Sequence, residues 1–164
     1  MDDETLDALD HEAHVGRALE LARQAAARGD DPYGSLLVRA ADGERLMSAR
    51  NAVATADDIR RHPELTLAYR AAREFSPAQR AGLVMYTSTE PCPMCAGGIA
   101  SAELGAVVHS VPAETGAEVY GREGFVRSAA VYDGLDCDVR VVGPVSPAAG
   151  EAVHREHRAN RREE

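Results

Sequence analysis

The sequence contains no lysine and no tryptophan, and no apolar run approaches the roughly 18 residues that a membrane-spanning helix needs. All of its 18 basic residues are therefore arginine, against 27 acidic residues, and the formal net charge is −9. This charge disfavours a general attraction to nucleic acid or to anionic lipid. We expect the partner to be a small molecule, and neither a nucleic acid nor a membrane.

Cysteine is also scarce. The chain has only Cys92, Cys95 and Cys137, an odd number that cannot form the disulfide framework of a small secreted protein. The first residues, Met1–Glu4, are acidic where a secretory signal would be positively charged. Both observations favour a cytoplasmic protein.

The remaining composition is that of an ordinary folded protein. Hydrophobic residues make up 45% and charged residues 27% of the 164 positions, which suits one domain with a buried core. The sequence shows no internal repeat, linker or low-complexity segment. We predict a single domain over residues 1–164, in which 1–9 and 158–164 are flexible ends.

Hydrophobic periodicity divides the chain into alternating helices and strands. Helices are predicted over residues 10–28, 65–75, 94–100 and 147–157, and proline stands near the start of the second and third. Strands are predicted over 35–39 and 45–49, joined as a hairpin by Asp42-Gly43, and over 83–87, 106–109 and 138–142. This alternation predicts an α/β layered fold with a partly parallel sheet.

Three side chains have the chemistry of a zinc site. His62 precedes the pair Cys92 and Cys95, and one imidazole with two thiolates suits zinc. Three protein ligands leave a fourth position for water, which is typical of a catalytic site. Glu64 lies two residues after His62, too close to ligate with it, but well placed to move a proton to or from that water.

Each motif alone is compatible with several roles. A Cys-x-x-Cys pair can be a redox dithiol, half of a structural zinc ribbon or two buried cysteines, and His-x-Glu at a helix start can be a cap. In this order, His-x-Glu followed by Pro-Cys-x-x-Cys matches the pattern of zinc deaminases that act on nucleobases.

At this level the sequence resembles the cytidine deaminase-like superfamily, and within it the branch of guanine deaminases and tRNA adenosine deaminases. The resemblance covers residues 15–109 and is carried by the stretches Pro32–Ser35, Arg50-Asn51, His62–Glu64 and Thr87–Ile99. It implies a three-layer α/β/α fold with a mixed, mostly five-stranded sheet, a Zn²⁺ ion held by His62, Cys92 and Cys95, Glu64 as catalytic proton shuttle, and a homodimer.

The same resemblance gives roles to two further residues and leaves others open. Asn51 corresponds to the asparagine that hydrogen-bonds the base, and Tyr33 stands where the family places a pocket wall. The family approaches substrate near Ser88 and Thr89 through backbone, which gives their side chains no role. Relatives usually read Asp-Pro-Thr-Ala-His-Ala-Glu before the zinc helix, whereas this chain has Arg60-Arg61-His62-Pro63-Glu64, which leaves the substrate open.

The predicted function is therefore zinc-dependent hydrolytic deamination of a small aminated nucleobase or nucleoside, with a guanine-type purine favoured and ammonia released. This would be a hydrolase acting on a cyclic amidine. The alternatives are deamination of adenosine in tRNA, a cytosine-, cytidine- or triazine-type substrate and, in a different class, a non-catalytic zinc module or a thiol redox module.

Four further histidines stand in pairs three residues apart on predicted helices. Such pairs can bind metal, but no cysteine accompanies them. We expect these histidines to be surface residues without a role: His11, His14, His154 and His157.

Overall fold

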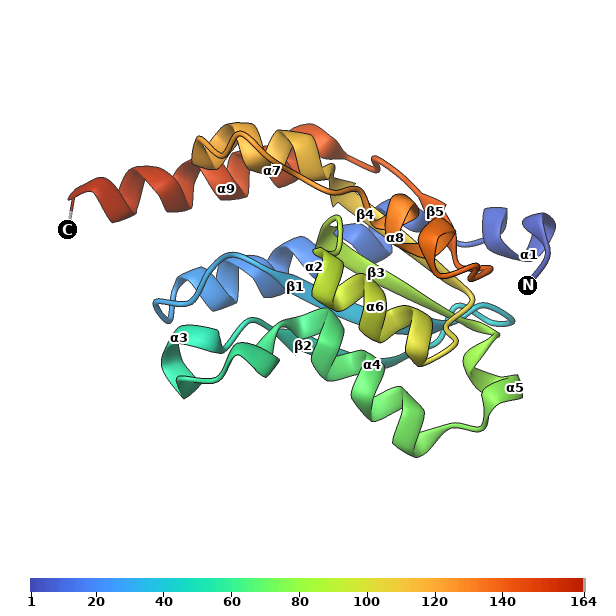
Figure 1. Ribbon diagram of the computed structural model, residues 1–164. Helices are drawn as coiled ribbons and strands as arrows, with labels where there is room; N and C mark the ends of the chain where they lie inside the picture. The colour runs from blue at the N-terminus through green and yellow to red at the C-terminus, as the bar shows by residue number, and fades with distance from the viewer. Residues whose placement is uncertain (164) are drawn as a thin grey trace.

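The computed structural model describes the backbone of residues 1–163 and the side chains of residues 1–161 (Figure 1). In chain order its elements are α1 (Asp3–Asp7), α2 (His11–Ala26), β1 (Gly34–Arg39), β2 (Arg45–Arg50), α3 (Val53–Ala56), the 3-10 helix η1 (Ile59–Arg61), α4 (Pro63–Glu74), α5 (Pro77–Arg80), β3 (Leu83–Thr89), α6 (Pro93–Ser101), β4 (Ala106–Val111), α7 (Ala113–Tyr120), α8 (Ser128–Gly134), β5 (Arg140–Val142) and α9 (Pro147–Glu163).

The five strands form one mixed sheet in the order β2-β1-β3-β4-β5. β1 is antiparallel to both β2 and β3, whereas β3, β4 and β5 run parallel. The parallel pairs are joined through helices, as parallel strands require, because a short turn cannot bring the chain back to the same end. The predicted strands, the hairpin and the partly parallel sheet are confirmed.

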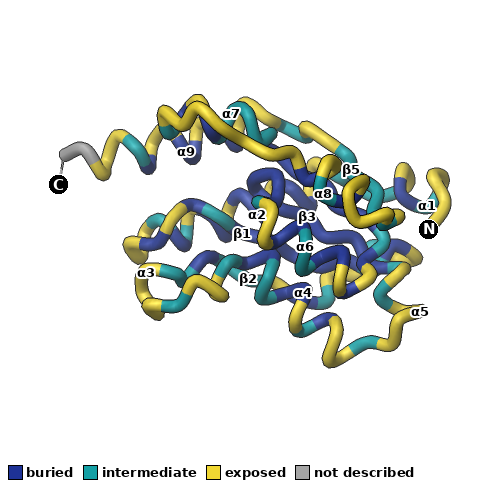
Figure 2. Tube along the Cα trace, in the orientation of Figure 1, coloured by how far each residue is buried: buried dark blue, intermediate teal, exposed yellow. Residues whose placement is uncertain are grey.

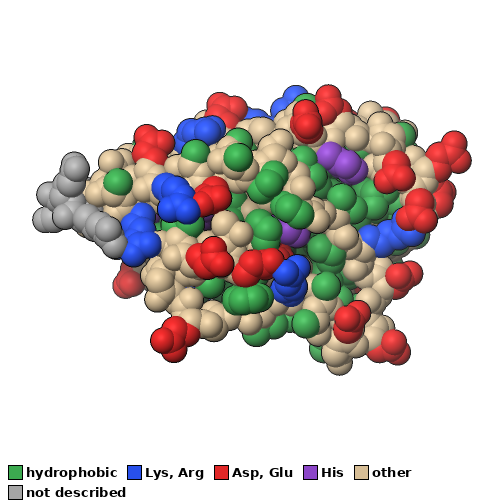
Figure 3. Space-filling view, turned by 90° about the horizontal axis from the view of Figure 1, so that it is seen from above, with side chains coloured by type: hydrophobic (Ala, Val, Ile, Leu, Met, Phe, Trp, Pro, Cys, Tyr) green, Lys and Arg blue, Asp and Glu red, His purple; other side chains and the backbone are tan. Residues whose placement is uncertain are grey.

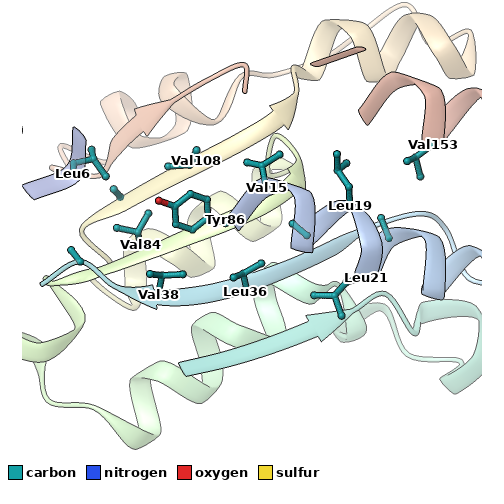
Figure 4. Packing of buried hydrophobic residues seen from close by; sticks show 14 residues of the cluster. Leu6, Val15, Leu19, Leu21, Leu36, Val38, Val84, Tyr86, Val108 and Val153 are labelled. Carbon is teal, nitrogen blue, oxygen red and sulfur yellow. The ribbon is translucent and has the colours of Figure 1, made fainter. Parts of the chain in front are cut away.

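Helices cover both faces of the sheet, which makes the three layers. On one face, α2 and α9 pack over apolar side chains of β1, β3 and β4 (Figure 4). The packing is seen in Val15 and Leu19 of α2, which lie over Leu36 of β1 and Tyr86 of β3. The predicted opening and closing helices are both confirmed, and this burial is the reason for the apolar spacing in α2.

On the other face, α4, α6 and α8 cover the alternate side chains of the same strands. Leu37, Met85 and Val107 point to this side and pack with Leu67 of α4 and Ile99 of α6. Because successive residues of a strand point to opposite faces, β3 is buried along its whole length (Figure 2). The core is therefore two apolar layers separated by the sheet.

One glycine allows the first helix to lie against the start of β1. A Cβ atom at Gly34 would stand 2.5 Å from the Ala18 carbonyl oxygen and 2.5 Å from the Leu21 Cβ. No side chain fits in that space, so glycine permits α2 to approach the strand directly before Ser35.

The ends of several strands meet at one edge of the sheet. β1 begins there, and β2, β3 and β4 end there, because Gly34 pairs with Arg50 and Ser35 pairs with Thr87. Helices α4 and α6 begin at the same edge, each with proline in its first turn. Carboxyl ends of parallel strands with helix N-termini beside them form a binding crevice in many open α/β sheets.

The two ends of the chain also have structure. Residues 1–9 contain α1, whose Leu6 is only 3% exposed, and α9 continues through residues 158–163. The flexibility that we expect of these ends stays a prediction, and residue 164 lies outside the described residues. Among the residues described, no helix combines the length and the apolar character needed to cross a membrane.

Candidate active site

The starts of α4 and α6 bring one histidine and two cysteines together. His62 and Cys92 are the N-cap residues of these helices, and Cys95 lies one turn into α6. The Nδ1 atom of His62 is 3.5 Å from Cys95 Sγ and 3.9 Å from Cys92 Sγ. Tetrahedral zinc with bonds of about 2.3 Å to sulfur and 2.0 Å to nitrogen would separate these atoms by about 3.5 Å. The three side chains therefore fit a zinc ion.

The electrostatic surroundings favour the thiolate that zinc requires. A hydrogen bond from the Cys95 thiol lowers the pKa of Cys92 well below its ordinary value, and the neighbouring His62 imidazole acts in the same direction. The N-terminus of α6 adds the positive end of a helix dipole. Cys92 is therefore prepared to act as an anionic ligand, with Cys95 losing its proton when a metal binds.

Glu64 lies beside this group and is almost completely buried, with 4% of its surface exposed. Its Oε1 atom accepts a hydrogen bond of 2.6 Å from the Thr87 hydroxyl and one of 3.1 Å from the Ser35 hydroxyl. Burial raises the pKa of Glu64, and the Thr87 hydroxyl partly opposes this shift. A carboxyl group with a raised pKa can both accept and return a proton near neutral pH.

A cavity of about 370 Å³ opens directly above these residues. This volume lies within the range of about 300–1000 Å³ that is usual for small-molecule sites. One wall is formed by Asp31, Tyr33, Asn51, Val53, His62, Glu64 and the segment Thr89–Pro93, and the other by Ala113, Gly116, Ala117, Tyr120, Arg122, Gly124, Phe125 and Val126.

Asn51 and Tyr33 both line the cavity. The Asn51 side chain is 1% exposed, and its Oδ1 atom accepts a 2.8 Å hydrogen bond from the Val53 backbone. Its backbone N–H donates to the Tyr33 carbonyl, which joins the two residues. Burial raises the pKa of Tyr33 to about 12, so its phenol stays neutral.

The arginines beside His62 turn away from the cavity. Arg60 donates two hydrogen bonds, of 2.9 Å and 3.0 Å, to the Asp58 carboxylate, and its side chain is 79% exposed. Arg61 is also exposed and lies 3.5 Å from the same carboxylate. Neither lines the cavity, and both belong to a solvated ion pair at the helix start.

Residues 9–111 match the profile of the cytidine and deoxycytidylate deaminase zinc-binding region. The chain belongs to this deaminase family. The match includes His62, Glu64, Cys92 and Cys95, and zinc is the family's metal. The protein is therefore a zinc-dependent hydrolytic deaminase, as the sequence motifs predicted.

Relatives of this deaminase act on two kinds of substrate, according to their names. The guanine deaminase of Bacillus subtilis is 32% identical over 119 residues, which are 72% of this chain and 75% of the relative. The tRNA-specific adenosine deaminase of the same species is 30% identical over 97 residues, 59% of each chain. A solved guanine deaminase from Nitrosomonas europaea superposes with a TM-score of 0.77 at 22% identity, covering 90% of this chain and 84% of that one, which confirms the fold.

The second wall of the deaminase cavity lies beyond the family match, and the sequence did not reveal it. It is tied to the first wall by the buried Glu90. One Glu90 oxygen accepts a 2.9 Å hydrogen bond from the Ala113 backbone, and the other accepts 2.8 Å and 2.9 Å bonds from the backbone and hydroxyl of Ser128. A single carboxylate thus holds the first residues of α7 and α8, where backbone N–H groups need acceptors.

The expectation that the paired histidines are surface residues is wrong for three of them. His14, His154 and His157 are 8%, 1% and 7% exposed, and His11 is partly buried. Their helices turn these side chains toward the protein interior, where His157 Nε2 lies 3.5 Å from an Asp31 carboxylate oxygen. Hydroxyl groups are the hydrogen-bond partners of two of the others: Tyr86 for His11, and Thr89 and Tyr120 for His154. Such partners compensate the loss of water on burial.

Proposed function

We propose that this deaminase removes the exocyclic amino group of a small nucleobase or nucleoside, and that a guanine-type purine is its substrate. The observation that carries this proposal is the buried Glu64 carboxylate, held by two hydroxyl groups beside the group of His62, Cys92 and Cys95 at the base of the cavity. A zinc site that served only structure would not need a buried acid with a raised pKa facing the cavity.

In this proposal His62, Cys92 and Cys95 hold the metal. When bound, zinc supplies Lewis-acid chemistry that lets water act as a nucleophile at neutral pH. The N-caps of α4 and α6 place these ligands on converging helix ends, so the site is organised by the fold and not by a loop alone.

Glu64 would carry the protons. Its carboxylate takes a proton from the attacking water and delivers it to the ring nitrogen next to the carbon that carries the amino group. A carbon–oxygen bond forms, the carbon–nitrogen bond breaks, and ammonia leaves with a second proton passed on by Glu64. The hydroxyls of Thr87 and Ser35 fix Oε1 during both transfers.

Asn51 and Tyr33 would orient the base. The bond from the Val53 backbone fixes the Asn51 amide plane, so its Nδ2 group can donate to an acceptor on the base edge. Tyr33 presents a half-buried aromatic side chain to the cavity, and its ring offers an apolar wall to a planar heterocycle.

Two substrates have specific support. Guanine is favoured by the similarity to a guanine deaminase over 72% of this chain. Adenosine in tRNA is the second candidate, because a tRNA-specific adenosine deaminase is 30% identical. The charge of −9 counts against the RNA substrate, and Figure 3 shows arginines interspersed with acidic side chains and no continuous basic surface on that face.

We also propose a cytoplasmic homodimer built from one domain per chain. The dimer is supported by the family resemblance and by large apolar side chains on the outside of η1, α4 and α6, where Ile59, Tyr69 and Met94 are 66%, 61% and 38% exposed. Sedimentation at micromolar concentration tests this, and a monomer throughout would contradict it.

The deciding experiment is ammonia release by the zinc-loaded protein. The panel contains guanine, adenine and cytosine, their nucleosides and nucleotides, and a tRNA anticodon stem-loop. We expect release from guanine. Release from the stem-loop alone, with a steep dependence on salt, would replace guanine by the tRNA substrate, and no release from any member would contradict both.

A further inference from the structure

A buried histidine joins two hydroxyl groups on opposite walls of the cavity. His154 of α9 lies 2.7 Å through its Nε2 atom from the Thr89 hydroxyl and 2.9 Å through its Nδ1 atom from the Tyr120 hydroxyl. Thr89 and Tyr120 both line the cavity, whereas His154 stands behind them and is 1% exposed. Its ring is flanked by Tyr33, at 5.5 Å between ring centres, and by Tyr120, at 5.6 Å.

The His154 imidazole and the two hydroxyl groups together carry three polar hydrogens, one more than their two hydrogen bonds need. A neutral imidazole has one N–H donor and one nitrogen acceptor, and each hydroxyl has one hydrogen. Two hydrogen bonds therefore use two of the three available hydrogens. Among the described residues, neither the Thr89 nor the Tyr120 hydroxyl bonds to any other side chain, so the remaining hydrogen belongs to a group on the cavity wall.

The two hydroxyls differ as donors. A phenol, with an ordinary pKa of about 10, is a stronger donor than an aliphatic hydroxyl. On this ground we assign the two contacts of 2.7 Å and 2.9 Å as follows: Tyr120 donates to Nδ1 of His154, the ring hydrogen is on Nε2, and Nε2–H donates to the Thr89 oxygen. The Thr89 oxygen then accepts a bond from behind, and its own O–H is turned outward.

We infer that the Thr89 hydroxyl is a hydrogen-bond donor to the substrate, and that His154 is the positioning residue that holds it as a donor. The group recognised would be an acceptor without a hydrogen, such as a ring nitrogen or a carbonyl oxygen of the base. A base that presents an N–H at that position would meet a second donor and be rejected. This inference rests on the proposed function, because it concerns selection of its substrate.

The position of His154 agrees with this role. Burial lowers its pKa to about 4, so the ring remains neutral and keeps one donor and one acceptor at physiological pH. It lies outside residues 9–111, which match the family profile, and its contacts are with residues 65 and 34 positions away in the chain.

The test is a double-mutant cycle in which one change is made in the protein and the other in the substrate. Thr89→Val removes the hydroxyl and keeps the branched shape, and Thr89→Ser keeps the hydroxyl. The substrates are guanine and its 7-deaza and 9-deaza analogues, each of which lacks one nitrogen of the five-membered ring and keeps the ring nitrogen next to the reacting carbon. We expect one analogue to lose about tenfold in kcat/KM with the wild type, which is the value of one such hydrogen bond.

With Thr89→Val, kcat/KM for guanine should fall by the same factor of about ten. The kcat/KM for the sensitive analogue should fall little further, because the donor and the acceptor belong to the same hydrogen bond. Thr89→Ser should behave like the wild type. Equal losses for guanine and every analogue would show a structural effect and overturn the inference. If the loss of the substrate acceptor is coupled to Tyr120→Phe and not to Thr89→Val, Tyr120 is the donor and the assignment of Thr89 is overturned.

His154→Phe tests the positioning role, since it keeps an aromatic ring between the tyrosines and removes both hydrogen bonds. We expect it to reduce the coupling between Thr89 and the acceptor while zinc content stays unchanged. The matched control is His11→Phe, which removes another histidine–tyrosine hydrogen bond, of 2.8 Å to Tyr86, away from the cavity. Full coupling in His154→Phe would contradict the positioning role.

Failure of this inference is separate from failure of the proposed function. A wild-type protein that releases no ammonia from guanine contradicts the proposed substrate. A wild-type protein that does so, with no coupling at Thr89, contradicts only the assignment of the donor.

Discussion

The two walls of the cavity differ in how they are held. The metal-side wall consists of lining residues between positions 31 and 93, which lie at strand ends of the sheet and at the helix starts beside them. Its Glu64, Asn51 and Thr89 are at most 8% exposed. The outer wall, formed by residues 113–126, is α7 and an exposed connection, in which Phe125 and Val126 are 50% and 48% exposed (Figure 2).

This difference separates the groups that need a fixed geometry from a surface that only contacts the ligand. Groups that must keep a fixed geometry during the reaction lie on the wall that two apolar layers make rigid. The outer wall is held by the buried Ala117 and Val119 of one short helix and by polar contacts from Glu90, His154 and Arg158, and it supplies surface for a ligand to contact. Changes at Glu64 on the first wall should therefore affect kcat, and changes on the second wall should mainly affect KM.

The largest effect is expected from Glu64→Gln. The amide cannot accept and return a proton, so kcat should fall by about 10³-fold or more, within the range for general acid–base catalysis. Zinc content, measured by mass spectrometry, should stay at the wild-type level. The matched control is Glu74→Gln at the exposed end of α4, which should retain full activity, and a Glu64→Gln protein with near-native kcat would refute the proton shuttle.

The next effect is a loss of stability in acid that depends on His154. Its pKa is about 4 in the folded protein, against an ordinary value of 6.5, because burial opposes the charged form. Between these values the unfolded chain binds a proton that the folded chain does not. The contribution of neutral His154 to the free energy of unfolding is therefore fully present above pH 6.5. It is lost as the pH falls toward 4, and the loss is roughly 3 kcal/mol.

Urea unfolding at pH 7.5 and pH 4.5 measures this loss. His154→Gln cannot titrate, so its free energy of unfolding should fall less between the two pH values than that of the wild type. Equal falls would assign the acid sensitivity to other titratable groups and not to His154.

A smaller effect is expected from Glu90→Gln, because Glu90 joins the two walls. The amide nitrogen of the variant would face the backbone donor of Ala113 or the two donors of Ser128, and should lower the free energy of unfolding by about 2 kcal/mol. Glu114→Gln on the outer wall is the control, because its ion pair with Arg127 is partly exposed and should contribute less than about 1 kcal/mol. Equal losses in the two variants would contradict the special position of Glu90.

The smallest effect on folding should come from Phe125→Ala. Its side chain is half exposed, so the stability should change by less than about 0.5 kcal/mol. Lost contact with the base should raise KM about fivefold and leave kcat nearly unchanged. Leu135→Ala, equally exposed but away from the cavity, should change neither, and an unchanged KM in Phe125→Ala would place the base elsewhere.

Much of the fold and of the metal side could be predicted from local patterns. The helices α2 and α4 have apolar stripes at helical spacing, and β3 is a continuous apolar run because both of its faces are covered. His62, Glu64, Cys92 and Cys95 could be grouped because each lies at or near the start of a helix in a fixed order. Such signals depend on neighbours in the chain.

The outer wall gave no such signal. α7 and α8 have only eight and seven residues, which is about two turns each and too short for a repeated apolar spacing to be recognised in the sequence. The bond between Tyr120 and His154 joins residues 34 positions apart, and Glu90 lies 38 positions from Ser128. Partners at such separations are determined by the folded arrangement, which is also why the histidine pairs were assigned to the surface.

The bonds to Glu90 have a consequence for how this protein could diverge. Ala113 and Ser128 are fixed by opposite oxygens of one carboxylate, so a single side chain joins the start of α7 to the start of α8. The exposed connection between these helices, residues 121–127, could be lengthened, shortened or replaced without shifting either attachment point. Substrate range could then evolve by exchange of one surface segment, while the ancestral reaction continues unchanged beneath it.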